Sequence, residues 1–281
     1  MAVEQINIPI GPYVEYAVDW VQNNLTGLLD GISATIGFIV NNLEDFLLWV
    51  PGWLLALVII GFGIWRVNWR FGIFAAVAMF LIFGMNLWEE TVSTLALVVA
   101  SSIVALAVGV PLGISMARND LVEMIIRPVL DFMQTMPPFV YLIPAAIFFG
   151  LGKVPGTIAT VIFAMPPAVR LTNLGIRQVS KEQVEAGLAF GCTARQLLFK
   201  VQLPLAMPSI MAGVNQTIML ALSMVVIASM IGAGGLGNTV LTGIQRLNVG
   251  LGFEGGLGVV LLAILLDRIT QSFGQARKGK R

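Results

Sequence analysis

Apolar runs of bilayer length, separated by short polar loops, most constrain what this chain can fold into. Of its 281 residues, 57% are hydrophobic and only 11% are charged, whereas a soluble domain carries about 25% charged residues. So little polar material cannot cover a water-facing surface. Several runs approach or reach the ~17–25 apolar residues that a helix needs to cross a bilayer. The composition therefore predicts an all-α integral membrane protein.

Seven apolar segments are predicted to cross the membrane: residues 51–65, 71–87, 91–117, 137–151, 156–169, 208–231 and 255–266. The first two form an N-terminal pair (residues 51–87), and the others belong to residues 88–272. Residues 1–50 are acidic and contain no Lys or Arg. Within them, Asp30, Asn41 and Glu44 make a spanning helix over residues 28–49 costly. We expect an amphipathic segment in the outer membrane interface; a poor spanning helix is the alternative.

The Lys and Arg residues fall almost entirely on one side of such a seven-span bundle. Of the 16 in the chain, only Lys153 and Arg246 lie on the opposite side. The basic segment at residues 273–281 lies with the majority. Loops on the cytoplasmic side of membrane proteins are enriched in Lys and Arg. We therefore expect a multi-pass protein of a bacterial cytoplasmic membrane, with its N-terminus outside and its C-terminus inside.

Residue types for common catalytic chemistry are scarce. The sequence contains no His and a single Cys, Cys192, which excludes His/Cys metal sites and disulfides within one chain. The string Gly-Leu-Gly-Lys at residues 150–153 lacks both the spacing and the Ser/Thr of a Walker A motif. We expect no catalytic residue, no metal site and no bound cofactor, so the chain does not itself hydrolyse ATP.

The polar segment over residues 179–204, here called the coupling loop, begins with helix signals. Ser180 followed by Gln183 is a capping-box pattern, which predicts a helix starting near residue 181. Gly191 then occupies the position of a left-handed residue that ends a helix. The resulting short helix is too small to be a domain, and its size suits a groove on a partner protein.

A second helix is predicted to follow the glycine. Thr193 followed by Gln196 is another capping-box pattern. Leu203 and Pro204 are expected to stop this helix, since proline disrupts a helix interior, and Pro208 is expected to open the next span. The coupling loop is therefore predicted to read helix, glycine turn, helix.

The coupling loop resembles the EAA loop of ABC-importer permeases. That motif is Glu-Ala-Ala, three residues, Gly, nine residues, Ile, any residue and Leu-Pro; here residues 185–187 read Glu-Ala-Gly and residues 201–204 read Val-Gln-Leu-Pro. Gly187 replaces the second Ala and weakens a helix by up to ~1 kcal/mol, which does not remove it. The resemblance implies that an ATPase-coupling element is formed by Glu182, Glu185, Ala186, Gly187, Leu188, Gly191, Leu203 and Pro204.

Wider stretches resemble the permeases of glycine betaine/proline betaine importers. Residues 131–141, 163–168 and 218–226 carry this likeness, which covers most of residues 50–272. It implies the type I ABC-importer permease fold and an osmoprotectant substrate such as glycine betaine. It also implies a second permease copy in a homodimer, two cytoplasmic ATPase subunits that hold ATP and Mg, and an extracellular or periplasmic substrate-binding protein. Membrane lipid surrounds the protein, and no nucleic-acid partner is expected.

Prolines within the spans mark a candidate translocation path, since irregular backbone at membrane depth is tolerated where it faces protein or a cavity. The candidate residues are Thr135, Met136, Pro137, Pro138, Tyr141, Pro166 and Pro167. Simple helix kinks are the alternative. The glycines of Gly109-x-x-x-Gly113 allow close helix packing.

A stand-alone secondary transporter or channel for a small zwitterion is the rival function. Such proteins usually place ionisable or ion-coordinating groups at mid-membrane. Charges inside the predicted spans are nearly absent here, and Asp267 and Arg268 lie near an inner end, where they can pair with each other. A membrane-bound enzyme has little support, because no His, thiol pair or carboxylate pair occupies a plausible site.

Overall fold

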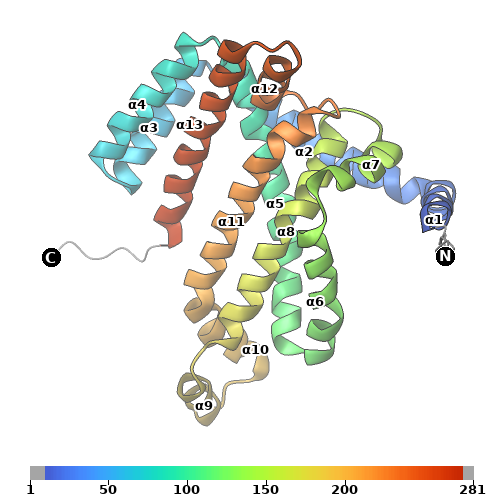
Figure 1. Cartoon of the computed structure of the whole chain (residues 1–281). Helices are drawn as coiled ribbons and strands as arrows, with labels where there is room; N and C mark the ends of the chain where they lie inside the picture. Colours follow the sequence, from blue (N-terminus) through green and yellow to red (C-terminus); the bar gives the residue numbers. More distant parts are fainter. Residues whose placement is uncertain (1–9, 275–281) are drawn as a thin grey trace, which may run out of the picture.

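The computed structural model describes residues 10–274, and these residues form helices joined by short turns (Figure 1). The predicted all-α fold is confirmed. The start of the acidic N-terminal segment and the basic residues at 277–281 lie outside the described residues, so the expectation placed on that tail stays a prediction.

The centre of the protein is formed by three long helices, α5 (Trp88–Arg118), α8 (Lys153–Arg177) and α11 (Leu203–Ser229), which pack side by side (Figure 1). Glycines allow the close approach of α5 to α8. A Cβ atom on Gly113 would lie 2.5 Å from the carbonyl oxygen of Val169, and one on Gly109 would lie 3.1 Å from the Cβ of Ala168. The Gly109-x-x-x-Gly113 pattern therefore does serve helix packing.

A second group of helices packs against this centre. α13 (Val249–Gly274) packs on α11, and α12 (Gly235–Gln245) lies against α13, α11 and α5. The hairpin of α3 (Gly52–Arg66) and α4 (Trp69–Gly84) lies beyond α13, on the left of Figure 1. Arg66 donates a hydrogen bond to the carbonyl of Ser272 at 3.2 Å and lies 4.6 Å from the ring centroid of Phe273. The hairpin is thereby tied to the end of α13.

The predicted fourth span, residues 137–151, corresponds to the short helix α7 (Pro138–Phe149), which has only 12 residues. α6 (Asp120–Thr135) precedes it with 16 residues, and the two are bent from one another by 101°. Together they are long and apolar enough for a broken span or a re-entrant loop. The break follows from two prolines, since the residue before a proline is driven out of the helical region: Met136 has ψ 135° and Pro137 has ψ 136°.

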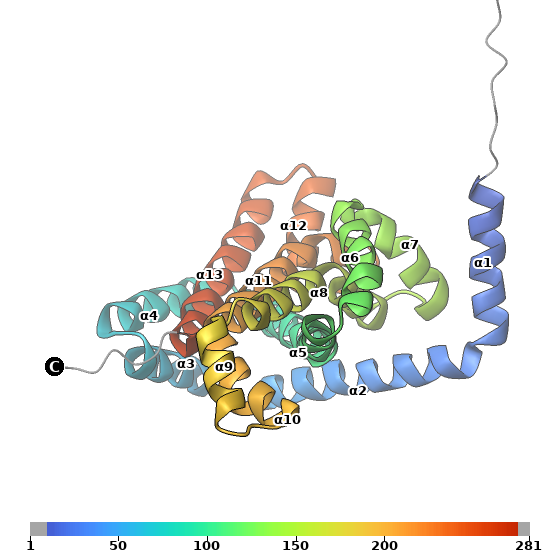
Figure 2. The ribbon, with the colours of Figure 1, turned by 90° about the horizontal axis from the view of Figure 1, so that it is seen from below.

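The N-terminal helices run across the bundle. Figure 2 shows α5 end-on and α2 (Thr26–Trp49) along its length, after α1 (Ile10–Asn24). α2 packs on α5 and α8, and it is bent by 99° from α3 at Pro51. Its Glu44 is only 7% exposed and forms an ion pair with Lys153 at the start of α8. This transverse direction agrees with the expected interfacial segment, whose position in the membrane stays a prediction.

Four helical segments of residues 10–274 are long and apolar enough to cross a membrane, or up to six if each bent pair is one span. The four are Trp88–Arg118, Lys153–Arg177, Ala194–Ser229 and Val249–Gly274, and the bent pairs are α2 with α3 and α6 with α7. α4 is apolar but has 16 residues. The seven spans expected from the sequence thus correspond to four long helices, two bent pairs and one short helix.

Candidate functional site

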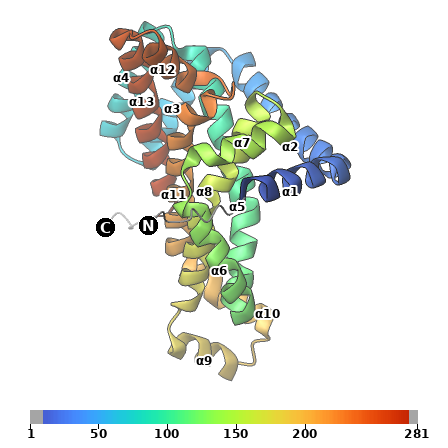
Figure 3. The same cartoon turned by 45° about the vertical axis from the view of Figure 1, so that its right-hand side comes forward.

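The coupling loop projects from one end of the bundle, beyond the ends of α5 and α6, in Figures 1 and 3. It contains α9 (Lys181–Ala189), α10 (Ala194–Leu197) and a π-helical turn, η1 (Leu198–Gln202). The predicted order of helix, turn and helix is confirmed for the start of this segment.

Gly191 ends α9 as predicted. Its φ of 76° lies in the left-handed region. Its N–H donates to the carbonyl of Leu188 at 2.9 Å, and the N–H of Cys192 donates to the carbonyl of Gly187 at 3.1 Å. These two bonds form the Schellman motif, which satisfies carbonyls left free at a helix end. The turn that joins α9 to α10 therefore requires the glycine conformation.

The two predicted capping boxes have different outcomes. At Thr193 the hydroxyl accepts from the N–H of Gln196 at 3.3 Å, and the Gln196 side chain accepts from the N–H of Thr193 at 2.9 Å. At Ser180, the N-cap of α9, no side-chain capping hydrogen bond forms. The first helix starts where expected, with Ser180 at its N-cap. The capping box is absent, because the Ser180 side chain accepts no hydrogen bond from the backbone of the first turn.

The prediction that Leu203 and Pro204 stop the second helix is wrong. The helical segment runs without a break from Ala194 to Ser229, and Pro204 lies in the first turn of α11. The N–H of Leu203 donates to the carbonyl of Leu198, five residues back. Such a widened π turn accommodates the proline, which lacks an N–H and would clash with a carbonyl in a regular α-helix. The second half of the coupling loop, from Ala194, is therefore helically continuous with α11, a candidate membrane-crossing helix.

Gly187 has a packing role that the sequence comparison did not reveal. It is buried, and a Cβ atom there would lie 2.8 Å from Cδ1 of Leu197. The glycine thus lets α9 lie against α10. The other residues of α9 that were predicted to couple to an ATPase, namely Glu182, Glu185, Ala186 and Leu188, are exposed. Glu185 makes no hydrogen bond or ion pair within residues 10–274, so its carboxylate is available to a partner.

Two apolar side chains extend this exposed surface. Leu188 is 53% exposed and Phe190 is 90% exposed. Beside them, a groove of about 470 Å³ lies along α10 and η1, lined by Thr193, Arg195, Gln196, Phe199 and Lys200. The groove was not predicted from the sequence. Residues 195, 196, 199 and 200 have the i, i+1, i+4, i+5 spacing of one helix face. This spacing is the sequence signal that could have found the groove.

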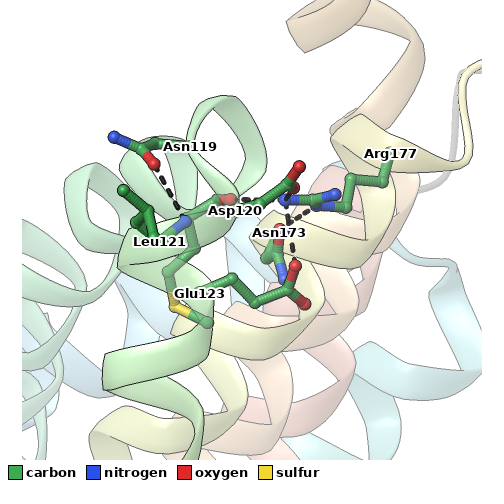
Figure 4. A network of polar contacts seen from close by, with 7 residues as sticks. Asn119, Asp120, Leu121, Glu123, Asn173 and Arg177 are labelled. Carbon is green, nitrogen blue, oxygen red and sulfur yellow. Dashed lines mark hydrogen bonds and ion pairs between the residues drawn. The ribbon is translucent and has the colours of Figure 1, made fainter.

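A second missed cluster lies at the base of the coupling loop, around Arg177 (Figure 4). This guanidinium contacts Asp120 at 2.6 Å and Glu123 at 2.9 Å, and donates to the carbonyl of Met116 at 2.8 Å. Its Nε donates to the side-chain oxygen of Asn173 at 3.1 Å. The side-chain amide nitrogen of Asn173 in turn donates to the carboxylate of Glu123 at 3.1 Å. Arg177 thereby joins the last turn of α8 to the α5–α6 corner, a few residues before α9 begins.

The candidate translocation residues fall into two places. Thr135, Met136, Pro137 and Pro138 lie at the bend between α6 and α7, and the buried Tyr141 donates from its hydroxyl to the carbonyl of Met133 at 2.5 Å. This bond satisfies a carbonyl left free at the end of α6. By contrast, both Pro166 and Pro167 are buried inside the unbroken α8, near Gly213 of α11. Their place on a path stays a prediction.

The expected pairing of Asp267 with Arg268 is wrong. The carboxylate of Asp267 accepts from Asn215 of α11 at 2.9 Å and from Gln271 at 2.7 Å, and no ion pair to Arg268 forms. Asp131 and Arg170 lie outside the predicted spans of residues 137–151 and 156–169, in segments expected to be loops. Both lie within helices, α6 and α8, and they form an ion pair.

The described helices thus form a bundle with several candidate membrane spans and a short exposed helix, α9, at one end (Figure 1). Residues 109–278 match the family described as "binding-protein-dependent transport system inner membrane component". This match spans more than half of the chain, and the chain belongs to this family. It is a multi-pass permease subunit of the cytoplasmic membrane, and ATPase and substrate-binding functions reside in separate partners.

Curated relatives cover almost all of the chain. The glycine betaine/carnitine transport permease protein GbuB of Listeria monocytogenes is 51% identical over 97% of this chain and 98% of its own length. The glycine betaine/proline betaine transport system permease protein ProW of Escherichia coli is 47% identical over 97% of this chain and 77% of its own length. The glycine betaine transport system permease protein OpuAB of Bacillus subtilis is 45% identical, over 97% of each.

Solved structures described as inward-facing conformations of the MetNI methionine ABC transporter share the fold. In the native crystal form the TM-score is 0.57 at 21% identity, covering 67% of this chain and 92% of that chain. In a second crystal form, a SeMet soak, the TM-score is 0.56 at 20% identity. The expected type I ABC-importer permease fold is thereby confirmed.

Proposed function

We propose that this permease imports glycine betaine or a related quaternary ammonium osmoprotectant, delivered by an external binding protein and driven by a cytoplasmic ATPase. The observation that carries this proposal is the 45–51% identity to three permeases named for glycine betaine, over 97% of this chain. The alternative, a stand-alone transporter or channel for a small zwitterion, leaves the exposed coupling loop without a use.

In this proposal α9 docks on the ATPase through its exposed face, which carries Glu182, Glu185, Ala186 and Leu188. ATP and Mg bind to the ATPase subunits, and this chain holds no cofactor. Closure of the ATPase pair displaces α9, and the Schellman turn at Gly191 passes the displacement to α10. Because the helix from Ala194 to Ser229 is unbroken, the motion reaches α11 through Leu203 and Pro204 without an intervening hinge. Alternating access follows as α11 moves.

The path itself is proposed to lie between two copies of the chain in a homodimer. The bend at Thr135, Met136, Pro137 and Pro138, supported by Tyr141, forms one wall of it. Two observations support this arrangement: the bend is irregular backbone within a broken span, and such backbone at membrane depth must face protein or a cavity.

Cys192 offers a direct test of orientation, because it is the only cysteine of the chain and lies in the coupling loop. With the N-terminus outside and the C-terminus inside, a membrane-impermeant maleimide should label Cys192 in inside-out vesicles and not in intact spheroplasts. A Cys192→Ser variant is the matched blank. Labelling confined to spheroplasts would place the loop outside and end the proposal of ATPase coupling.

The transport function is tested in proteoliposomes that contain the permease, its ATPase and its binding protein. Uptake of radiolabelled glycine betaine is expected to require both the binding protein and internal ATP, and to fall to the level of empty liposomes when either is omitted, because ATP hydrolysis and substrate capture reside in those partners. A panel of proline betaine, carnitine and choline measures preference. Uptake by the permease alone, without ATP or receptor, would establish the stand-alone alternative instead.

A further inference from the structure

The ion pair between Asp131 and Arg170 lies at an unusual depth. α6 begins at Asp120 and α8 ends at Arg177, and these two residues contact each other at the inner end of the bundle. At about 1.5 Å per residue, Asp131 lies about 16 Å along α6 from that end, and Arg170 lies about 10 Å along α8 from it. The hydrocarbon core of a bilayer is about 30 Å thick. α8 is a candidate membrane span of 25 residues, so it is about 37 Å long and exceeds that core by only about 7 Å. Arg170, with its partner Asp131, therefore lies within the depth of the hydrocarbon.

At this depth the pair is still open to its surroundings. The Arg170 side chain is 38% exposed and that of Asp131 is 56% exposed in the single chain. A charged group facing lipid costs about 2.5–3.5 kcal/mol on insertion scales, and such groups face a bundle interior or a water-filled cavity. The exposed side of this pair must therefore face a polar space or a second copy of the chain.

The pair belongs to a polar stripe that leads to the α6–α7 bend. Arg127, Asp131, Gln134 and Thr135 are exposed and follow helical spacing on α6. Beyond Asp120 at the start of the helix, the other exposed positions are apolar, including Leu121, Ile125 and Phe132. One side of α6 is thus suited to lipid, and the stripe beside it suits an aqueous route from the inner end to the candidate path residues.

We propose that Asp131 and Arg170 form a contact site for a zwitterionic substrate on the translocation path. This inference rests on the proposed import function and adds to it the residues that meet the substrate. A guanidinium binds a carboxylate with two parallel hydrogen bonds. A quaternary ammonium has no N–H, so it meets Asp131 through charge alone. A betaine on the path can therefore replace the ion pair with two contacts of its own: its carboxylate binds Arg170 and its ammonium lies against Asp131.

Charge balance favours this exchange. With the path empty, the two side chains neutralise each other; with substrate present, each is neutralised by one end of the zwitterion. Neither state leaves an unpaired charge at membrane depth, which would be costly. A lone cation or anion, in contrast, has to separate the pair and leave one member without a partner. The site thus discriminates zwitterions from single ions.

The double variant Asp131→Asn/Arg170→Gln tests this proposal, because removing both members of an ion pair leaves no uncompensated charge and is often neutral for folding. In proteoliposomes with receptor and ATPase, its glycine betaine uptake is expected to fall at least tenfold, while receptor-stimulated ATP hydrolysis stays within about twofold of wild type. Wild-type uptake by the double variant would overturn the proposal. Loss of uptake together with loss of stimulated hydrolysis would also overturn it, since the pair would then act in assembly.

The matched control is Glu44→Gln/Lys153→Gln, which removes a different interhelical ion pair of α8, at the first residue of that helix. This control is expected to retain uptake within about twofold, and a tenfold loss there would show that any interhelical pair is needed, which overturns the assignment to substrate. Wild-type protein is measured in the same preparation. Failure of wild-type uptake would count against the import function itself, separately from the role of this pair.

Discussion

Replacing Gly191 with Val is expected to reduce ATP-dependent uptake at least tenfold while leaving the chain in the membrane at wild-type level. The residue has φ 76° and both bonds of the Schellman motif depend on that conformation. A non-glycine residue held in this region costs about 1–3 kcal/mol, and a β-branched one is a clear outlier. Since every 1.4 kcal/mol is tenfold, most molecules would carry α9 in another position.

The comparison that isolates backbone conformation is Gly191→Asn, because Asn is the residue that most readily replaces Gly at a left-handed helix end. No heavy atom of another segment lies within 4 Å of an added Cβ at Gly191, so side-chain size alone does not disturb the turn. The Asn variant is expected to keep at least half of wild-type uptake. Equal, wild-type uptake by both variants would show that the turn does not position the docking helix.

Local signals in the sequence predicted the coupling loop well where the structure depends on neighbours a few residues apart. The stop at Gly191 and the capping box of Thr193 with Gln196 are both of this kind, and both are confirmed. The stop expected at Pro204 failed because a proline inside a helix can be accommodated by a widened turn, and nothing in the local pattern announces that turn.

Apart from the capping box that does not form at Ser180, the remaining errors concern contacts between distant parts of the chain. Asp131 was placed in a linker before the predicted span of residues 137–151, whereas it lies in α6, which forms a bent pair with α7. Arg177 looked like one more inner-loop charge, although it joins three helices. Its partners in α5 and α6, namely Met116, Asp120 and Glu123, lie more than 50 residues earlier in the sequence, a distance at which hydropathy and helix punctuation carry no information about pairing.

Replacing Arg177 with Met is expected to loosen the base of the coupling loop and to lower uptake about fivefold or more. Glu123 and Asn173 would lose their shared partner, and their side chains are 24% and 7% exposed respectively. A hydrogen bond to a charged group contributes about 1.5–3 kcal/mol; partial exposure of the Arg177 side chain, at 35%, places the loss toward the lower end. The measurements are thermal unfolding of the purified permease and uptake per ATP hydrolysed.

The matched control for this prediction is Asp120→Asn, which removes the other carboxylate of the same network. Asp120 is 87% exposed, and exposed ion pairs contribute about 0–1 kcal/mol, so this variant is expected to resemble wild type in both measurements. Arg177→Lys keeps the charge but lacks the planar fork that reaches Glu123, Asn173 and the Met116 carbonyl together, and an intermediate loss is expected.

If Arg177→Met unfolds at the wild-type temperature and transports at the wild-type ratio, the network does not hold the loop. If Asp120→Asn lowers the unfolding temperature and the uptake per ATP as much as Arg177→Met does, the exposed ion pair with Asp120 contributes more than about 1 kcal/mol. The expectation that Glu123 matters more than Asp120 would then be wrong. The difference between these variants therefore measures how firmly the last turn of α8 must be held for motion of α9 to reach the membrane.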